Sequence, residues 1–311
     1  MRFYFAPLEG ISGYIYRNAY HTYFGEIDKY FIPFIMPNQF GHLSSKEKND
    51  ILPEHNEGMA AVPQILTNSA DDFIRTARKL KTYGYREVNL NLGCPSRTVV
   101  TKGRGSGFLA FPDKLDHFLE EIFSAADIRI SIKTRIGKES PEEFDHLLEI
   151  YQKYPLAELI IHPRLQTDIY KNTPDWEVFG RAVGSCGCNI CYNGDIFSVQ
   201  DYRRFEEAFP DVGCVMLGRG ILSNPGLVCE IKNHTPLEKS TLKAFHDRIY
   251  VDYQKVLSGD RTILFKMKEL WFYMAPLFTN YEKYAKKIRK SEKLTVYEKA
   301  VEALFSEQEI V

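Results

Sequence analysis

The sequence predicts a (β/α)8 barrel followed by a small helical domain. Short β-rich runs alternate with helical stretches over the first three quarters of the chain, which is the pattern of parallel βαβ units. Several runs, such as Leu159-Ile160-Ile161, are apolar without alternation, as expected for strands that are covered on both faces. Because eight such runs follow one another, we expect a closed barrel over residues 1–235 and a helical domain over residues 240–311.

The predicted strands are rich in β-branched and aromatic residues and are bounded by residues that favour turns. In chain order they are Phe3–Ala6, Tyr30–Ile35, Ala60–Ile65, Glu87–Asn91, Arg129–Thr134, Leu159–His162, Asn189–Asn193 and Val215–Gly218.

Helical periodicity fills the intervals between many of these strands. The predicted helices are Ala70–Tyr83, Pro112–Ala126, Pro141–Tyr154 and Ser198–Phe209. The long polar segment Asn38–Gly58 exceeds an ordinary βα connection, so we interpret it as a functional loop over the barrel mouth or as an inserted hairpin or helix.

The strand signal stops near residue 236, and the rest of the chain has helical patterns with breaks at Gly259-Asp260 and Ala275-Pro276. The predicted helices there are Leu242–Leu257, Thr262–Met274 and Tyr281–Phe305. We expect the run Trp271-Phe272-Tyr273-Met274 to pack in the core of this domain. The basic residues of the last helix form either a solvated face or a contact with an RNA backbone.

The composition excludes several classes of protein. A formal net charge of −1 provides no global positive field for nucleic acid, so any RNA contact must be local. No apolar stretch is long enough to span a membrane, and no leader precedes the first strand, so we expect a cytoplasmic protein. Six irregularly spaced cysteines do not suggest a disulfide framework, and Cys186, Cys188 and Cys191 form only a weak zinc pattern.

Polar residues stand where the predicted strands end. In a (β/α)8 barrel the carboxyl ends of the strands carry the active site, so these residues are candidates for it. They are Gln64, Asn91, Lys133 with Arg135, and His162 with Arg164, and the first strand ends in Ala6-Pro7.

Two glycine-containing turns follow the last two strands, at the position where barrels commonly bind phosphate. They are Asn193-Gly194-Asp195 and Gly218-Arg219-Gly220. Each leads into a helix, whose first N–H groups can hold a phosphate without any basic side chain.

Taken in order, these motifs resemble the tRNA-dihydrouridine synthase family over the whole chain. The resemblance depends on Ala6-Pro7-Leu8-Glu9-Gly10, Asn91-Leu92-Gly93-Cys94-Pro95-Ser96, Lys102-Gly103, Ile132-Lys133-Thr134-Arg135, His162, Arg164 and the two glycine turns. The string around Cys94 is the most specific of them. One departure is His162-Pro163-Arg164, where many members have glycine in the middle.

The resemblance implies an enzyme that binds FMN and reduces the C5=C6 bond of uridines in tRNA, with NADPH as a transient reductant. Hydride would pass from flavin N5 to C6, and Cys94 would donate the proton to C5. A thiol with an ordinary pKa of about 8.5 is protonated at neutral pH and suits that role. The implied FMN contacts are Ala6, Pro7, Gln64, Lys133, His162, Asn193, Gly194, Asp195, Gly218 and Arg219.

The implied substrate contacts are Asn91, Lys102, Arg135 and Arg164 near the uracil or its phosphates, and Lys286, Lys287, Arg289 and Lys290 on the RNA backbone. Three alternatives stay open: the same chemistry on ribosomal RNA, a flavoenzyme similar to dihydroorotate dehydrogenases that acts on a free pyrimidine, and a non-catalytic RNA-binding barrel. The sequence indicates no metal, no membrane association and no obligate protein partner.

Overall fold

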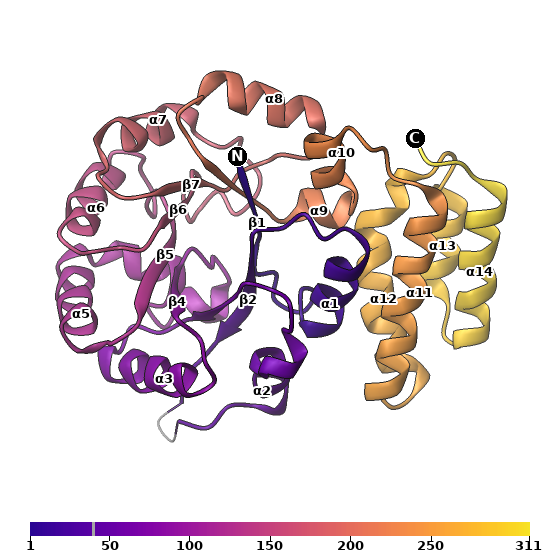
Figure 1. Ribbon diagram of the computed structural model, residues 1–311, viewed down its shortest axis with the longest axis horizontal. Helices are drawn as coiled ribbons and strands as arrows, with labels where there is room; N and C mark the ends of the chain where they lie inside the picture. Colours follow the sequence, from indigo (N-terminus) through magenta and orange to yellow (C-terminus); the bar gives the residue numbers. More distant parts are fainter. Residues whose placement is uncertain (39–40) are drawn as a thin grey trace. The chain divides into compact units, whose positions relative to one another are not determined.

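The computed structural model describes residues 1–38 and 41–311, and it contains the predicted barrel (Figure 1). Eight strands pair in chain order into a closed barrel. They are β1 (Arg2–Phe5), β2 (Lys29–Ile35), β3 (Ala61–Ile65), β4 (Glu87–Leu92), β5 (Arg129–Arg135), β6 (Leu159–His162), β7 (Ile190–Tyr192) and β8 (Cys214–Leu217). Each lies within one or two residues of its predicted bounds, because strands buried on both faces leave an unbroken apolar signal.

Every neighbouring pair of strands is parallel, and the first strand closes the barrel against the last. Arg2 of β1 is paired with Cys214 of β8, and Phe5 is paired with Leu217. Asn91 of β4 is paired with Lys133 of β5, and Arg135 is paired with His162 of β6. This register brings the polar ends of β4, β5 and β6 to the same edge of the barrel.

Helices occupy the intervals between the strands and the C-terminal part of the chain. They are α1 (Tyr14–Tyr23), α2 (Ser45–Ile51), α3 (Ala70–Thr82), α4 (Arg97–Val100), α5 (Pro112–Ala125), α6 (Glu143–Gln152), α7 (Trp176–Ser185), α8 (Val199–Ala208), α9 (Arg219–Ser223), α10 (Leu227–Asn233), α11 (Lys239–Val256), α12 (Asp260–Met274), α13 (Glu282–Lys290) and α14 (Leu294–Glu307). Short 3-10 turns lie at Pro53–His55, Gly105–Ala110 and Ala275–Leu277.

The segment Asn38–Gly58 contains a helix, which is one of its predicted forms, although residues 39 and 40 lie outside the described part. Ser44 caps α2 by accepting a hydrogen bond from the Glu47 N–H, and the Glu47 carboxylate accepts from the Ser44 N–H in return. This reciprocal cap stabilises a helix of seven residues that is too short to leave a clear periodic signal.

The prediction of one helix over Tyr281–Phe305 is wrong, because the chain breaks there into α13 and α14. Ser291 ends α13 with both its N–H and its hydroxyl directed to the carbonyl of Ile288. The N–H of Leu294 then finds a new partner in the Asp260 carboxylate. A serine side chain that bonds the backbone competes with continuation of the helix. The periodicity of apolar residues does not reveal this competition.

By its internal packing the chain divides into two compact units that are not continuous in sequence. Unit 1 comprises Met1–Pro7, Asp28–Asp195 and Phe205–Leu217, and it contains all eight strands. Unit 2 comprises Leu8–Ile27, Ile196–Arg204 and Gly218–Val311. The boundary predicted between residues 235 and 240 therefore stays a prediction.

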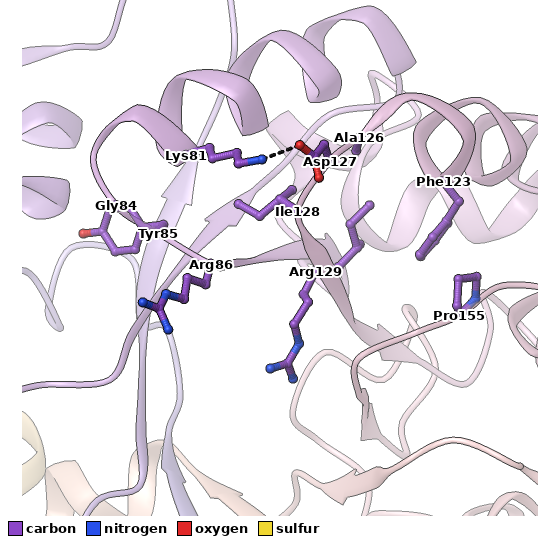
Figure 2. Close-up of a pocket in the computed structure, with 11 residues that line it drawn as sticks. Lys81, Gly84, Tyr85, Arg86, Phe123, Ala126, Asp127, Ile128, Arg129 and Pro155 are labelled. Carbon is purple, nitrogen blue, oxygen red and sulfur yellow. Dashed lines mark hydrogen bonds and ion pairs between the residues drawn. The ribbon is translucent and has the colours of Figure 1, made fainter.

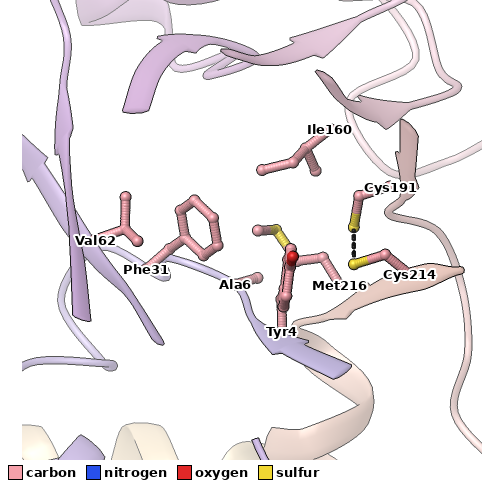
Figure 3. Close-up of a cluster of buried hydrophobic side chains, with 8 residues drawn as sticks. All are labelled: Tyr4, Ala6, Phe31, Val62, Ile160, Cys191, Cys214 and Met216. Atoms are coloured by element: carbon pink, nitrogen blue, oxygen red, sulfur yellow. Dashed lines mark hydrogen bonds between the residues drawn. The ribbon is translucent and has the colours of Figure 1, made fainter. Parts of the chain in front are cut away.

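Apolar side chains from six strands fill the middle of the barrel in unit 1. Figure 3 shows this core, which consists of Tyr4, Ala6, Phe31, Val62, Ile160, Cys191, Cys214 and Met216. Because side chains alternate across a strand, the next residue but one toward the carboxyl end also points inward. The core therefore fixes which residues of β3 and β6 face the barrel mouth, namely Gln64 above Val62 and His162 above Ile160.

Charged residues close the opposite end of the barrel, where the strands begin. Lys29 Nζ bonds both Glu87, at 3.0 Å, and Glu158, at 3.4 Å, and the hydroxyl of Tyr4 donates to Glu158 at 2.8 Å. A pocket of about 640 Å³ lies on the same side, before β4 and β5, with Lys81 paired to Asp127 at its edge (Figure 2). This pocket is at the wrong end of the strands for a barrel active site.

Unit 2 has a core of its own, built largely from aromatic residues. Tyr16 of α1 packs edge-on against Phe245 of α11 at 5.4 Å between ring centroids. Trp271 is 2% exposed and bonds the hydroxyl of Tyr297, which confirms its predicted place in a core. Phe272, predicted to be buried beside it, is 77% exposed, because consecutive residues of a helix point to different sides.

No helix in the described ranges combines the length and the apolar character that a bilayer crossing requires.

Candidate active site

The carboxyl ends of β3 to β6 gather polar side chains from unit 1. Gln64, Asn91, Lys133 and His162 all occupy the inward positions that strand alternation assigns to them. Ala6 reaches the same end from β1, where its N–H bonds the carbonyl of Leu217. The fold therefore brings these predicted residues to one end of the barrel.

A chain of buried amides runs across β3, β4 and β5 below this end. Asn91 Nδ2 donates to Gln64 Oε1 at 2.6 Å, and Gln64 Nε2 donates to Asn89 Oδ1 at 2.7 Å. Asn89 Nδ2 in turn donates to the Ser131 hydroxyl at 3.0 Å. Because each member is buried and satisfied, the chain fixes the rotamers of Gln64 and Asn91.

The loop that carries Cys94 depends on Asn91. The Asn91 side-chain oxygen accepts from the N–H of Gly93 at 3.1 Å and from the N–H of Cys94 at 2.9 Å. On the other side, the Cys94 carbonyl accepts from the Ser106 N–H at 3.1 Å and from its hydroxyl at 2.9 Å. The backbone of Cys94 is thus held from two directions, and its side chain is half-buried.

Gly105 lies directly against this loop and must be glycine. Its φ is +55°, in the left-handed region, and a Cβ there would lie 2.8 Å from the Cys94 carbonyl oxygen and 2.9 Å from Val99. Both the conformation and the close approach exclude a side chain.

Lys133 is a cation without an anionic partner. In residues 1–38 and 41–311 its ammonium group has no hydrogen bond or ion pair within the structure, and only part of the side chain is exposed. Burial and the neighbouring positive charge of Arg135 lower the pKa of Lys133 to about 7. Near neutral pH the lysine is therefore poised between its charged and neutral forms.

Arg135 is 1% exposed, and its guanidinium donates hydrogen bonds to backbone carbonyls. It donates to Gly93 at 3.0 Å, to Leu165 at 2.7 Å and to Ile169 at 2.7 Å. Ile169 has a φ of +54°, a strained value for a β-branched residue, and the bond from Arg135 helps to hold it there. The predicted role of Arg135 in binding substrate stays a prediction, since its contacts here join the loops after β4 and β6.

Arg164 links His162 to Asp195. Its two terminal amino groups donate to the two oxygens of the Asp195 carboxylate. One of them also lies 2.9 Å from His162 Nε2. Arginine can only donate, so Nε2 must accept, and His162 is the neutral tautomer with its proton on Nδ1. Pro163 does not displace Arg164, because the turn is closed by the Arg164 N–H on the His162 carbonyl.

The two glycine turns are close-packed within their own units. In unit 1 a Cβ on Gly194 would lie 1.9 Å from the Tyr192 hydroxyl, and Asn193 Nδ2 donates to the Met216 carbonyl at 2.8 Å. In unit 2 a Cβ on Gly220 would lie 2.0 Å from the Ile196 carbonyl oxygen. Packing alone therefore requires these glycines, and their phosphate role stays a prediction.

The remaining predicted residues lie elsewhere. Lys102 is exposed on unit 1, in the loop after α4, where its carbonyl accepts from Asn68. Gly218 and Arg219 belong to unit 2, and Arg219 lies over the ring of Phe197 at 5.4 Å. The four residues of α13 that are predicted to contact the RNA backbone are exposed on unit 2: Lys286, Lys287, Arg289 and Lys290.

Sequence reasoning missed three residues that shape the site. Ser106 and Gly105 belong to the glycine-rich stretch Gly103–Gly107, and the position of Gly105, 11 residues after Cys94, is the only sequence signal for a support of that loop. Tyr170 follows Ile169, and its ring lies 6.0 Å from that of His162 and 5.4 Å from the Arg135 guanidinium. No periodic pattern marks it.

The chain matches the family model described as dihydrouridine synthase (Dus) over residues 4–310. It is 30% identical over 235 residues to the tRNA-dihydrouridine(16) synthase of Pseudomonas putida, covering 73% of this chain and 72% of that protein. It is 27% identical over 263 residues to a probable tRNA-dihydrouridine synthase of Staphylococcus aureus, covering 81% and 78% of the two chains.

Solved structures share the fold at low sequence identity. Morphinone reductase in complex with tetrahydroNAD is similar with a TM-score of 0.53 at 13% identity, over 77% of this chain and 89% of that one. The old yellow enzyme homologue of Zymomonas mobilis is similar with a TM-score of 0.54 at 12% identity, over 78% and 92%. At such low sequence identity, these similarities show that the chain shares the barrel fold with these proteins.

Proposed function

The chain belongs to the dihydrouridine synthase family, and from this premise we propose that it reduces the C5=C6 bond of specific uridines in tRNA to 5,6-dihydrouridine. We propose FMN as its bound cofactor and NADPH as the reductant. The observation that carries the proposal is the double support of the Cys94 backbone, from Asn91 and from Ser106, at the carboxyl end of β4.

The residues at the barrel mouth fit a flavin by their chemistry. Lys133 offers a cation that no carboxylate of the described chain neutralises, and the electronegative edge of a flavin ring would supply its missing partner. Gln64 offers an amide whose rotamer is already fixed by Asn89 and Asn91. We propose that Ala6, Pro7, Gln64, Lys133 and His162 contact the ring, and that Asn193, Gly194, Asp195, Gly218 and Arg219 hold the phosphate.

When bound, FMN supplies the hydride that no protein side chain can supply. The protein supplies the proton: we propose that the Cys94 thiol donates it to C5 of the uracil. A general acid must carry its proton at the working pH. A cysteine thiol with an ordinary pKa of about 8.5 meets this requirement at neutral pH.

Asn91 acts in the proposed reaction as a positioning residue. Its oxygen orients the peptide that precedes the Cys94 side chain, and its amide group is itself oriented by Gln64. A proton donor must lie within hydrogen-bond reach of the atom that it protonates, so a small rotation of this loop would slow the reaction strongly.

Substrate binding would extend beyond the barrel. We propose that Lys102 and the basic residues of α13 contact RNA phosphates, since the net charge of −1 leaves such attraction to local groups. Arg135 and Arg164 each donate several hydrogen bonds inside unit 1, and we propose that they support binding by holding the loops after β4 and β6 in place.

The test uses purified protein and three substrates. The protein should be yellow, its flavin should be bleached by NADPH, and it should form dihydrouridine in tRNA isolated from cells that lack this gene. Ribosomal RNA and free orotate or uracil serve as the alternative substrates. Turnover of a free pyrimidine without turnover of RNA, or a colourless protein that cannot be loaded with FMN, would contradict the proposal.

A further inference from the structure

Two cysteines face each other outside the site described above. Cys186 and Cys188 flank Gly187 in the short connection between α7 and β7, and their sulfur atoms lie 2.7 Å apart. Both side chains are half-buried, while Gly187 and the neighbouring Ser185 and Asn189 are exposed. A small molecule can therefore reach this pair of thiols from solvent.

The backbone holds the pair from both ends. The Cys186 N–H bonds the Ala182 carbonyl at 2.9 Å and so closes the last turn of α7. After the pair, the Asn189 carbonyl accepts from the Leu159 N–H at 2.9 Å, which ties it to β6. The sulfurs are thus neighbours because of the fold, and little conformational entropy remains to be lost when a bond forms between them.

The two thiols also change each other's pKa in opposite directions. The hydrogen bond between the two sulfurs lowers the pKa of Cys186 to about 6, and the same contact raises the pKa of Cys188. A thiolate is the nucleophile in thiol chemistry, so Cys186 is the member able to attack first.

Cys191, Cys214 and Cys229 do not combine solvent access with a lowered pKa. Cys191 and Cys214 lie 3.1 Å apart on β7 and β8, but both are fully buried in the barrel core (Figure 3). Burial raises the pKa of Cys191 well above its ordinary value. Burial likewise raises the pKa of Cys229 in unit 2. Neither of these sites combines access with a thiolate.

We propose that Cys186 and Cys188 form a thiol–disulfide exchange site whose substrate is a low-molecular-weight disulfide such as glutathione disulfide. The Cys186 thiolate attacks one sulfur of that disulfide, forms a mixed disulfide and releases one glutathione thiolate. Cys188 then loses its proton to solvent and attacks the Cys186 sulfur. This second step forms the Cys186–Cys188 disulfide and releases the second glutathione, so two protein thiols are oxidised while one disulfide is reduced to two thiols.

The proposal is independent of uridine reduction. The pair stands before β7, at the end of that strand opposite to Asn193, and neither cysteine is one of the residues proposed to bind FMN or RNA. Failure of one proposal therefore leaves the other intact.

The experiment equilibrates the purified full-length protein in buffers of graded glutathione to glutathione disulfide ratio. The reaction is quenched with acid, free thiols are alkylated, and mass spectrometry of the intact chain and its peptides counts the cysteines that escape alkylation. We expect one internal disulfide, located in the peptide that contains both Cys186 and Cys188, and its reversal by excess dithiol. Alkylation of both cysteines at every ratio would overturn the proposal.

Two variants test the order of the steps. Cys188→Ser should trap glutathione on Cys186, since no second thiol remains to release it, and the adduct should form severalfold faster than any adduct on Cys229. Cys186→Ser removes the sulfur contact that raises the pKa of Cys188 most and leaves burial as the main remaining cause, so Cys188 should take up glutathione more slowly than Cys186 does in Cys188→Ser. Equal modification of the two single variants would contradict the assigned roles.

Gly184→Ala is the matched control for a change nearby, because a Cβ at Gly184 meets nothing within 4 Å. It should form the disulfide as the unaltered protein does. Loss of the disulfide in this control would mean that the local helix end, rather than the two thiols, determines the reaction, and would overturn the proposal.

Discussion

Arg164 and Asp195 form a bidentate ion pair across the ends of β6 and β7, with Arg164 1% exposed. The pair also fixes His162, whose Nε2 accepts from the same guanidinium. Three residues predicted separately from strand ends are therefore one hydrogen-bonded unit, in which a change at Asp195 reaches the proposed flavin contact at His162.

The first prediction concerns a variant that removes the negative charge of this ion pair. Asp195→Asn should lower the free energy of unfolding by about 3 kcal/mol, the lower end of the range for a broken buried ion pair, because the Asp195 side chain keeps 31% exposure. Urea denaturation of the flavin-free protein measures it. Asp211→Asn, at an exposed aspartate after α8, should change the free energy of unfolding by less than about 0.5 kcal/mol. Equal effects in the two variants would show that the ion pair contributes nothing.

The second prediction concerns Asn91 as the support of the Cys94 loop. Asn91→Ala leaves the N–H groups of Gly93 and Cys94 and the Gln64 oxygen without their partner, at a cost of about 1–3 kcal/mol for each group that stays buried. We expect turnover of tRNA to fall by about 100-fold or more, since misplacement of the proton donor is costly. Reduction of the bound flavin by NADPH should change much less.

The control for this variant is Asn49→Ala, at an exposed position of α2. Stopped-flow measurement of flavin reduction, and of its reoxidation by tRNA, separates the two half-reactions. If Asn91→Ala slowed both half-reactions equally, Asn91 would act on the flavin rather than on the Cys94 loop.

The third prediction separates close approach from backbone conformation at Gly105. Gly105→Ala adds both a strained positive φ and a collision with the Cys94 carbonyl, whereas Gly84→Ala adds only the strain, because its φ is +91° and nothing lies within 4 Å. We expect Gly84→Ala to lower the free energy of unfolding by about 1–2 kcal/mol and to leave tRNA turnover unchanged. Gly105→Ala should cost more stability and should also lower tRNA turnover at saturating FMN. Unchanged turnover in Gly105→Ala would mean that the loop tolerates the displacement.

The fourth prediction follows from the lowered pKa of Lys133, about 7 in the folded chain against about 10.4 in the unfolded chain. Between these values the unfolded state binds more protons, so the stability of the flavin-free protein rises with pH through this window. Lys133→Met removes that dependence. Its stabilising effect should be largest below about pH 7 and should shrink as pH rises, by at most about 1.4 kcal/mol per pH unit.

Chemical denaturation of both proteins across this window measures the effect. A stability difference between the unaltered chain and Lys133→Met that stays constant with pH would show that Lys133 has an ordinary pKa in the folded protein.

The barrel could be predicted from the sequence because its signals are local. Runs such as Leu159–His162 are apolar and short, and the residue that follows the apolar part marks the mouth of the barrel. The same logic located Gln64, Asn91 and Lys133. It could not foresee that Arg135 bonds three carbonyls or that Arg164 pairs with Asp195, because those contacts join residues 30 to 42 positions apart that no periodicity relates.

Burial on helices was predictable only where the period was clear. Trp271 and Phe272 differ by one position, yet one is in the core and the other faces solvent. The aromatic run Trp271-Phe272-Tyr273 predicts one packed unit, whereas a helix directs consecutive residues to different faces. The break at Ser291 was missed for a related reason, since the apolar period continues on both sides of it.

The most direct test of the account is a map of dihydrouridine in RNA from cells in which this gene is deleted and then restored as the unaltered gene or as Cys94→Ala. Mass spectrometry of tRNA and ribosomal RNA locates each modified position. The account predicts that defined tRNA positions lose dihydrouridine on deletion, regain it with the unaltered gene and do not regain it with Cys94→Ala, although that variant still binds FMN and is reduced by NADPH. Full restoration by Cys94→Ala, or a loss confined to ribosomal RNA, would contradict it.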